Sequence, residues 1–230
     1  FSKEIIKMKY DLSIIIAHYN PSDKNDIINP LIKTIETINS QKKNHKIEII
    51  IADDGSAYTN DLIEYYSTKK ITDKDKKYIY TLNGDKLSSW LSKKNINSDL
   101  INGWVYFPKY TGSMSKARVV NKCIDLSSSD KLCFLDDDNY FISKNSIENI
   151  LKLFDNYNLI IGQIQDNNKK YRSYNSYRVQ GTTIAVNKKI IENIGGFGEW
   201  TEEFSCGIDS DLWIKLYNHF IANDDLKACY

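Results

Sequence analysis

The chain of 230 residues is long enough to bury the core of one domain of ordinary size. Hydrophobic residues make up 41% and charged residues 27% of it, a balance that indicates a globular protein and excludes an intrinsically disordered one. The net charge of +1 gives no electrostatic reason to expect a nucleic acid or an anionic membrane as partner.

Targeting and redox features are sparse. No apolar run approaches the roughly 20 residues that cross a bilayer, so the sequence predicts no transmembrane segment, and no signal peptide is recognisable. Because the chain opens at Phe1 and not at Met, we expect a processed chain or an excised domain. The cysteines lack the spacing of a zinc site, which predicts free thiols and a cytoplasmic protein, either free or peripheral to a membrane. They are Cys123, Cys133, Cys206 and Cys229.

Apolar runs alternate with helical patterns at the start of the chain. Leu12–Ala17 is a continuous, β-branched apolar run, which predicts a strand buried on both faces, and it stops at the turn His18–Pro21. A helix is expected with Asn29 as its N-cap and Pro30 at its first position. Ile47–Ala52 predicts a second buried strand. This order predicts parallel strands joined by right-handed crossovers.

The middle of the chain is patterned more weakly. A short helix is expected at Asn60–Tyr66, followed by strands at Lys77–Leu82 and Trp104–Phe107. We interpret the segment between these strands, about 82–102, as an insertion on the surface, in which Trp90 lies among polar residues.

The second half combines helical patterns with short apolar runs that are typical of strands. In chain order these are a helix at Ser115–Asp125, a strand at Lys131–Leu135, a helix capped by Ser143, strands at Leu159–Gln165 and Thr182–Val186, a helix at Ile190–Ile194, and a last helix from near Asp209. The whole pattern predicts one α/β domain over residues 1–230, with a mixed, mostly parallel sheet flanked by helices.

Three polar clusters directly follow predicted strands, at the ends where open α/β sheets bind ligands. They are His18–Asn20, Asp53–Ser56 and Asp136–Asn139. Alternate residues of an extended turn project to one side, so Asp136 and Asp138 can face one cation while Asp137 points away. Carboxylate oxygens suit Mg²⁺ or Mn²⁺, particularly where a diphosphate supplies further ligands. The alternative is a solvated acidic turn that caps the next helix.

Other polar residues allow both a structural and a functional interpretation. A carboxylate of Asp53–Asp54 can accept a hydrogen bond from a base or a ribose, although Asp-Gly is primarily a turn dipeptide. Arg118 can reach a phosphate or remain a solvated helix residue. Asp209 and Asp211 lie in the first turn of the last helix, where the dipole favours acidic residues and where one of them can act as a general base. Trp200 can stack on a sugar ring or be buried.

The ordered set of these segments resembles the GT-A fold of the family 2 (GT2) inverting glycosyltransferases. The resemblance extends over most of the chain, and its order rather than any single motif is specific. It rests on Leu12–Asn20, Ile47–Ser56, Gly112–Asn121, Phe134–Asn139, Gly195–Glu199 and Gly207–Leu212.

The resemblance implies a Rossmann-like nucleotide-binding GT-A fold, with a nucleotide-binding half at about 10–140 and an acceptor-binding half at about 141–230. It also implies the inverting transfer of a hexose or related sugar from a nucleotide sugar, most often a UDP-sugar, to a hydroxyl acceptor. That acceptor can be a glycan, a lipid-linked sugar or another hydroxyl compound. Mn²⁺ or Mg²⁺ is the implied cofactor.

The resemblance also implies roles for individual residues. Asp136 and Asp138 would bind the metal, with Asp138 the more direct ligand. Glu199 and Trp200 would lie at the acceptor, and Asp209 would be the general base. Asp53 would contact the base of the nucleotide and Asp54 its ribose. The full set of residues implied at the nucleotide sugar is Ala17, Tyr19, Asp53, Asp54, Arg118, Asp136 and Asp137.

One departure from the family keeps alternatives open. Ile208 stands where the family usually has Glu, so Asp211 is an alternative base, and an inactive GT-A domain that binds a nucleotide or carbohydrate is an alternative function. A sugar-1-phosphate nucleotidyltransferase is a further alternative. That class has a Gly- and Arg-rich phosphate loop after its first strand, which His18–Pro21 lacks.

Overall fold

The computed structural model describes residues 10–22, 29–65, 78–108, 115–173 and 183–230. Its strands are β1 (Leu12–His18), β2 (Ile47–Asp53), β3 (Tyr80–Asn83), β4 (Gly103–Tyr106), β5 (Lys131–Asp136), β6 (Leu159–Ile161), β7 (Ile184–Asn187) and β8 (Ala228–Cys229). The α-helices are α1 (Asn29–Asn39), α2 (Gly84–Lys93), α3 (Lys116–Leu126), α4 (Ser146–Leu153), α5 (Lys188–Asn193) and α6 (Ile208–Ile221). The 3₁₀ helices in the described ranges are η2 (Ala57–Tyr65), η4 (Ser98–Leu100) and η5 (Glu199–Phe204).

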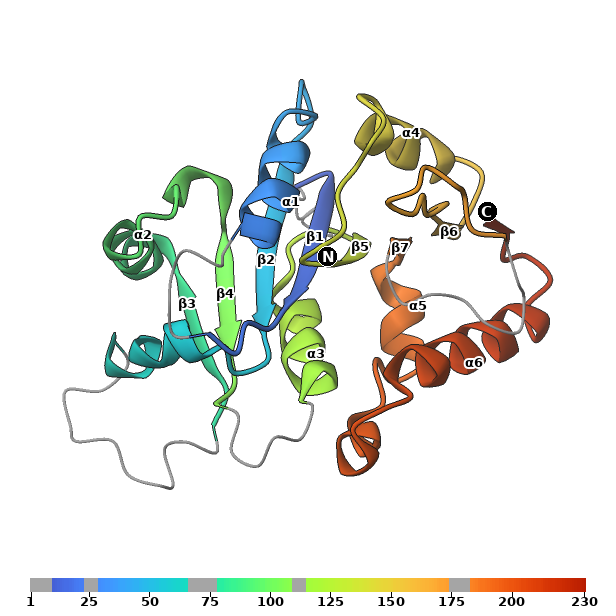
Figure 1. Ribbon diagram of the computed structural model, residues 1–230. Coiled ribbons are helices and arrows are strands. Elements are labelled where there is room, and N and C mark those ends of the chain that lie inside the picture. The colour runs from blue at the N-terminus through green and yellow to red at the C-terminus, as the bar shows by residue number, and fades with distance from the viewer. Residues whose placement is uncertain (1–9, 23–28, 66–77, 109–114, 174–182) are drawn as a thin grey trace, which may run out of the picture.

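The described strands form one eight-stranded sheet in the order β3-β4-β2-β1-β5-β7-β6-β8 (Figure 1). Its centre is parallel, because β1 pairs in parallel with both β2 and β5, and β2 pairs in parallel with β4. The antiparallel strands are β3, which pairs with β4, and β7, which lies between β5 and β6. The predicted mixed, mostly parallel sheet is confirmed.

Helices cover both faces of this sheet. Leu12, Ile14 and Ile16 of β1 belong to a core that includes apolar residues of α1, α2 and α4. Ile15 points to the opposite face and belongs to a second core that includes residues of α3, α5 and α6. Burial on both faces explains why the central strands are continuous apolar runs in the sequence.

The segment 82–102 differs from the prediction. It contains the helix α2, and the Trp90 side chain of this helix is 0% exposed. The Trp90 ring packs edge-to-face on Trp104 with ring centroids 5.0 Å apart, and Leu87 and Leu91 are buried beside it. The interpretation as a surface insertion was wrong, because Leu87, Trp90 and Leu91 form a narrow apolar helix face within a polar sequence.

The ends of several other elements differ from the predicted ones. The 3₁₀ helix η2 begins at Ala57 rather than at Asn60, and α4 begins at Ser146 rather than directly after Ser143. β6 ends at Ile161, and β8 was not predicted. Some predictions concern residues outside the described ranges, namely those at Tyr66, Lys77, Gly112 and Thr182.

All four cysteines are free thiols. Burial raises the pKa of Cys123, and it raises the pKa of Cys133 to about 12, so neither thiol forms a reactive thiolate near neutral pH. In the part of the chain that the structure describes, no helix has both the length and the apolar character needed to cross a membrane.

Candidate active site

The carboxyl ends of β1, β2 and β5 meet at one edge of the sheet. In the parallel register Ala17 pairs with Ala52 of β2 and with Asp136 of β5, and His18 pairs with Asp53. The three polar clusters that follow these strands in the sequence are therefore neighbours in space, as predicted.

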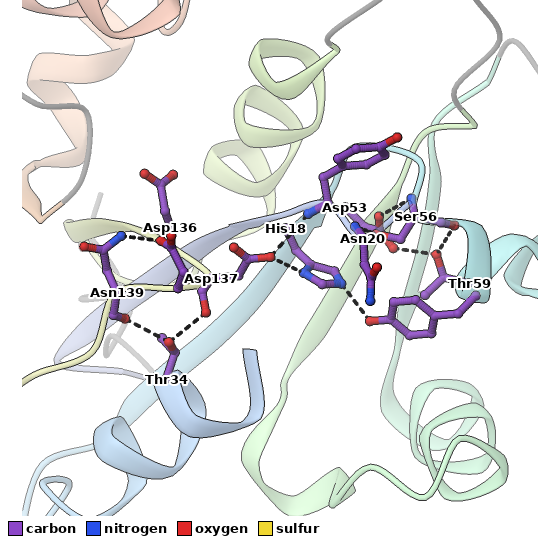
Figure 2. A network of polar contacts seen from close by, with 12 residues as sticks. His18, Asn20, Thr34, Asp53, Ser56, Thr59, Asp136, Asp137 and Asn139 are labelled. Carbon is purple, nitrogen blue, oxygen red and sulfur yellow. Dashed lines mark hydrogen bonds and ion pairs between the residues drawn. The ribbon is translucent and has the colours of Figure 1, made fainter. Parts of the chain in front are cut away.

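His18 connects two of these clusters (Figure 2). Its Nδ1 lies 2.5 Å from Asp137 Oδ2, and its Nε2 lies 2.7 Å from the Tyr58 hydroxyl. The Thr34 hydroxyl donates at 2.9 Å to the backbone oxygens of both Asp137 and Asn139. The Asp137 carboxylate therefore contacts His18 of β1, and the Thr34 bonds hold the acidic turn in place beside α1.

Tyr58 contributes a protonated hydroxyl to this network. Burial is the main cause that raises its pKa, and the nearby carboxylates of Asp53 and Asp137 raise it further. The hydroxyl therefore keeps its proton near neutral pH.

The two acidic residues after β2 are tied to different parts of the protein. Asp53 is fully buried: its Oδ1 accepts a hydrogen bond from the Ser56 backbone N–H at 2.8 Å, and its Oδ2 accepts from Thr59 Oγ1 at 2.6 Å and Trp104 Nε1 at 3.0 Å. These bonds shape the loop after β2 and leave no exposed surface of Asp53 for a ligand.

Asp54 is also buried, and it faces α3. Its Oδ1 accepts hydrogen bonds from the Ser115 backbone N–H, at 2.8 Å, and from the Ser115 hydroxyl. This contact fixes the start of α3 beside the end of β2.

At the end of β1, the Tyr19 side chain is exposed and Ala17 is half-buried.

Lys116, the first residue of α3, lies between two acidic residues from distant elements. Its Nζ is 2.8 Å from Asp136 Oδ1 at the end of β5 and 3.9 Å from Asp209 Oδ1 at the start of α6. Burial by itself lowers the pKa of Lys116, but the charges of Asp136 and Asp209 outweigh it and raise the pKa above its usual value. The ammonium therefore stays charged and joins the two carboxylates.

The carboxylates here suit a metal that is completed by other ligands. Asp138 is exposed and accepts a hydrogen bond from Asn139 Nδ2 at 2.6 Å. Asp209 Oδ1 is buried and has no hydrogen-bond partner among the described residues. Within those residues no three His, Cys, Asp or Glu side chains are grouped so that they could hold a metal. One or two carboxylates fit Mg²⁺ or Mn²⁺ when phosphates and water supply the remaining ligands.

Arg118 follows Lys116 on α3 and forms an ion pair with Glu202 of η5. Its Nε donates to Glu202 Oε1 at 3.0 Å, and its second terminal nitrogen donates to Glu202 Oε2 at 2.8 Å. These hydrogen bonds raise the pKa of Arg118, and its guanidinium also lies 5.0 Å above the Phe107 ring centroid. A phosphate that reaches Arg118 therefore has to compete with Glu202.

Asp209 and Asp211, which the sequence leaves as alternatives, differ in accessibility. The Asp211 side chain is 9% exposed, and the Asp209 side chain is 41% exposed. Asp211 accepts hydrogen bonds from the Gly198 backbone N–H at 2.8 Å and Trp200 Nε1 at 3.0 Å, and Lys215 Nζ lies 2.7 Å from it. Asp211 is thus occupied by the protein, which leaves Asp209 as the accessible carboxylate.

The glycine-rich segment before η5 is clasped by Asn121 of α3. Asn121 Oδ1 accepts from the Phe197 backbone N–H at 2.8 Å, and its Nδ2 donates to the Phe197 carbonyl at 2.9 Å and to Glu199 Oε1 at 3.2 Å. Gly196 has a φ of +67°, and a Cβ there would lie 2.6 Å from Asn121 Oδ1. This close approach accounts for the glycine, and the exposed Glu199 and Trp200 that follow are held by Asn121 and Asp211, respectively.

Sequence reasoning did not single out Lys116, Glu202 or Tyr58. Lys116 lies within the segment Gly112–Asn121 and Glu202 follows Gly195–Glu199, and this position, with the charge, is the signal that the sequence offers for them. Their partners, Asp136, Asp209 and Arg118, are known only once the elements are packed together.

The fold is that of the GT-A glycosyltransferases. The chain is similar to S. aureus TarS 1-349, with 14% identity over 90% of this chain and 55% of that chain and a TM-score of 0.57. It is similar to the mannosyltransferase PcManGT from Pyrobaculum calidifontis, solved in complex with GDP-Man and Mn²⁺, with 14% identity over 95% of this chain and 54% of that chain and a TM-score of 0.56. TarS 1-349 in complex with UDP-GlcNAc matches with a TM-score of 0.51 and 14% identity, over 90% of this chain and 53% of that chain.

The chain spans about half the length of these proteins. No protein-family model matches the sequence, and no curated protein matches it. The structural likeness confirms the predicted fold class. Sequence identities this low do not show that two proteins share an activity.

Proposed function

We propose that this protein is an inverting glycosyltransferase of family 2, which moves a hexose or related sugar from a UDP-sugar to a hydroxyl acceptor. The observation that carries this proposal is the position of Asp209, an accessible carboxylate that lies with Asp136 around the Lys116 ammonium. An acid–base group is thereby held beside the strand end at which α/β sheets bind nucleotides. The complexes of TarS with UDP-GlcNAc and of PcManGT with GDP-Man support a nucleotide sugar as donor.

The donor would lie along the carboxyl ends of β1, β2 and β5, in a nucleotide-binding half of about residues 10–140. Ala17 and Tyr19 would contact the base, and Asp54 would act at the ribose. Asp53 would contribute by holding the loop after β2, since its carboxylate is fully buried. Arg118 would bind a phosphate of the donor in place of its present partner, Glu202.

Asp136 and Asp138 would hold Mn²⁺ or Mg²⁺ together with the donor phosphates, and the Mn²⁺ present in the PcManGT complex supports a divalent metal as cofactor. The chemistry that a bound ion supplies is to neutralise the negative charge that develops on the departing diphosphate. The exposed position of Asp138 keeps its carboxylate available for this role.

Asp209 would act as the general base. It would accept the proton of the acceptor hydroxyl while the hydroxyl oxygen attacks the anomeric carbon from the side opposite the diphosphate. One such displacement forms the new glycosidic bond, breaks the bond to the diphosphate and inverts the configuration. Glu199 and Trp200, in an acceptor-binding half of about residues 141–230, would orient the acceptor, because Asn121 and Asp211 fix their side chains.

An inactive GT-A domain is the second candidate, and Ile208 is the observation in its favour. The Ile208 side chain is buried in the core shared with α3 and α5, so the position that usually carries Glu in the family supplies no acidic group here. Binding of a nucleotide without any transfer would be the behaviour of such a domain.

The test of the proposed function is a thermal-unfolding panel with UDP, GDP, CDP and CMP, each with and without Mn²⁺. A ligand at 100 times its Kd that binds only the folded state stabilises it by about 2.7 kcal/mol, which unfolding curves resolve easily. We expect a shift with UDP that requires Mn²⁺. A metal-independent shift with a different nucleotide would change the donor class, and no shift with any of them would contradict the proposal.

Asp138→Asn is expected to remove the Mn²⁺-dependent part of the UDP stabilisation with little effect on the unfolding temperature of the free protein. The reason is that Asp138 is exposed and its one described side-chain contact is with the neighbouring Asn139. Asp155→Asn, the same change at an exposed residue just after α4, is the matched control and should behave like the unmodified protein. Unchanged Mn²⁺ dependence in Asp138→Asn would exclude Asp138 from the metal site.

A further inference from the structure

The Lys116 ammonium lies where three elements converge. The start of α3 is fixed by the hydrogen bonds from Ser115 to Asp54, in the loop after β2. From this position Lys116 Nζ reaches Asp136 Oδ1 at 2.8 Å and lies 3.9 Å from Asp209 Oδ1. The Lys116 side chain is only 20% exposed, so salt screens these two interactions less than it screens a surface ion pair.

The two interactions of Lys116 are unequal. Asp136 accepts a hydrogen bond from the ammonium, whereas Asp209 Oδ1 is buried, attracts the same charge at longer range and has no hydrogen-bond partner among the described residues. The long, flexible stem of a lysine allows its ammonium to exchange one anionic partner for another by a small movement. Lys116 therefore places a cation on a flexible stem in the middle of an acidic site.

This cation competes with a divalent metal ion. A metal ligated by Asp136 Oδ1 would lie close to the Lys116 ammonium, and two cations at that separation repel each other strongly in a partly buried site. The repulsion is relieved only if the ammonium finds another anion. The phosphates of a nucleoside diphosphate are anions of this kind, and they also provide ligands for the metal.

We propose that Lys116 is the resident cation of the donor site, which suppresses metal binding to the free protein and transfers from Asp136 to a phosphate when a nucleoside diphosphate arrives. Metal and diphosphate then bind together and neither binds well alone. The inference rests on the proposed function for the identity of the diphosphate, but its effect on the metal is a property of the free protein. Lys116 thereby makes binding of the metal depend on binding of the diphosphate.

The test measures Mn²⁺ binding to the protein without nucleotide, from the loss of the electron paramagnetic resonance signal of free Mn²⁺. Lys116→Met is expected to tighten Mn²⁺ binding about tenfold or more, because it removes one neighbouring positive charge. The same variant should bind UDP without metal about tenfold more weakly. A variant that merely damages the site would weaken both, so the opposite signs are the diagnostic result.

Two further variants complete the design. Lys122→Met makes the same change on the same helix at a residue that forms no described ion pair with Asp136 or Asp209, and it should match the unmodified protein in both assays. Lys116→Arg keeps the charge and should keep Mn²⁺ binding weak. Mn²⁺ binding to Lys116→Met that is no tighter than to the unmodified protein would overturn the proposal, provided that circular dichroism shows the variant folded. Should Lys116→Met not fold, Lys116→Gln would be measured in its place.

Failure of the proposed function would be separately visible. If no nucleoside diphosphate stabilises the unmodified protein, with or without Mn²⁺, the donor assignment and the transfer of Lys116 to phosphate both fail. The comparison of Mn²⁺ affinities without nucleotide would still decide whether Lys116 suppresses metal binding.

Discussion

Asp209→Asn is expected to slow sugar transfer by about 100- to 10,000-fold, the range typical for the loss of a general base. An amide has almost the shape of a carboxylate but cannot take up the proton of the acceptor hydroxyl. The side chain is 41% exposed and its Oδ1 has no hydrogen-bond partner among the described residues, so the fold should be unaffected. The measurement is the initial rate of transfer from a UDP-sugar, with UDP binding followed in parallel by thermal unfolding.

The matched control is Asp211→Asn, two residues farther along the same helix. Asp211 holds Gly198, Trp200 and Lys215, so its replacement is expected to lower the stability of the segment before α6 more than it lowers the rate of the chemical step. An active Asp209→Asn together with an inactive but folded Asp211→Asn would transfer the role of base to Asp211. Normal transfer by both variants would contradict a carboxylate base at the start of α6.

The central strands could be predicted from the sequence because one physical cause acts on them. A strand covered by helices on both faces has to be apolar at every position, and Leu12–Ala17 and Ile47–Ala52 are such runs. The parallel arrangement follows from the helix between them, and it brings the polar residues after each strand to a common edge. The location of the site is therefore largely a consequence of local pattern and topology.

The roles of individual acidic residues could not be predicted in the same way. Asp53 and Asp54 are adjacent in the sequence, yet Asp53 is saturated by Ser56, Thr59 and Trp104, whereas Asp54 binds Ser115. Which carboxylate is occupied by the protein depends on donors that arrive from other elements. The same holds for Asp211, whose partners lie in the segment before α6 and one turn along it.

Lys116 is the clearest case of a candidate-site residue that only the packed structure identifies. It lies 20 residues from Asp136 in the sequence and far from Asp209, and its contacts require α3, β5 and α6 to be assembled. In a sequence with 31 basic residues, one lysine at the start of a helix carries no distinctive pattern. Its importance follows from where the sheet edge and α6 place their carboxylates.

Trp90→Ala is expected to reduce the free energy of unfolding by about 3–5 kcal/mol, as is typical when a buried aromatic side chain is removed. The Trp90 ring is 0% exposed, and it packs edge-to-face on Trp104, which in turn donates a hydrogen bond to Asp53. The change would leave a cavity between α2 and β4. It would also loosen Trp104, the hydrogen-bond donor to Asp53, whose carboxylate shapes the loop after β2. Urea denaturation followed by circular dichroism measures the effect.

Trp200→Ala is the matched control, because Trp200 is 56% exposed and an exposed side chain loses little burial when it is truncated. Its expected cost is within about 1 kcal/mol, and its effect should instead appear in the acceptor KM. A loss below about 1 kcal/mol for Trp90→Ala would mean that α2 is not part of the core, as the sequence pattern alone had indicated. The large expected loss has the opposite meaning: the segment 82–102 supports the part of the sheet that contains β2 and β4 from within, through Trp104 and Asp53.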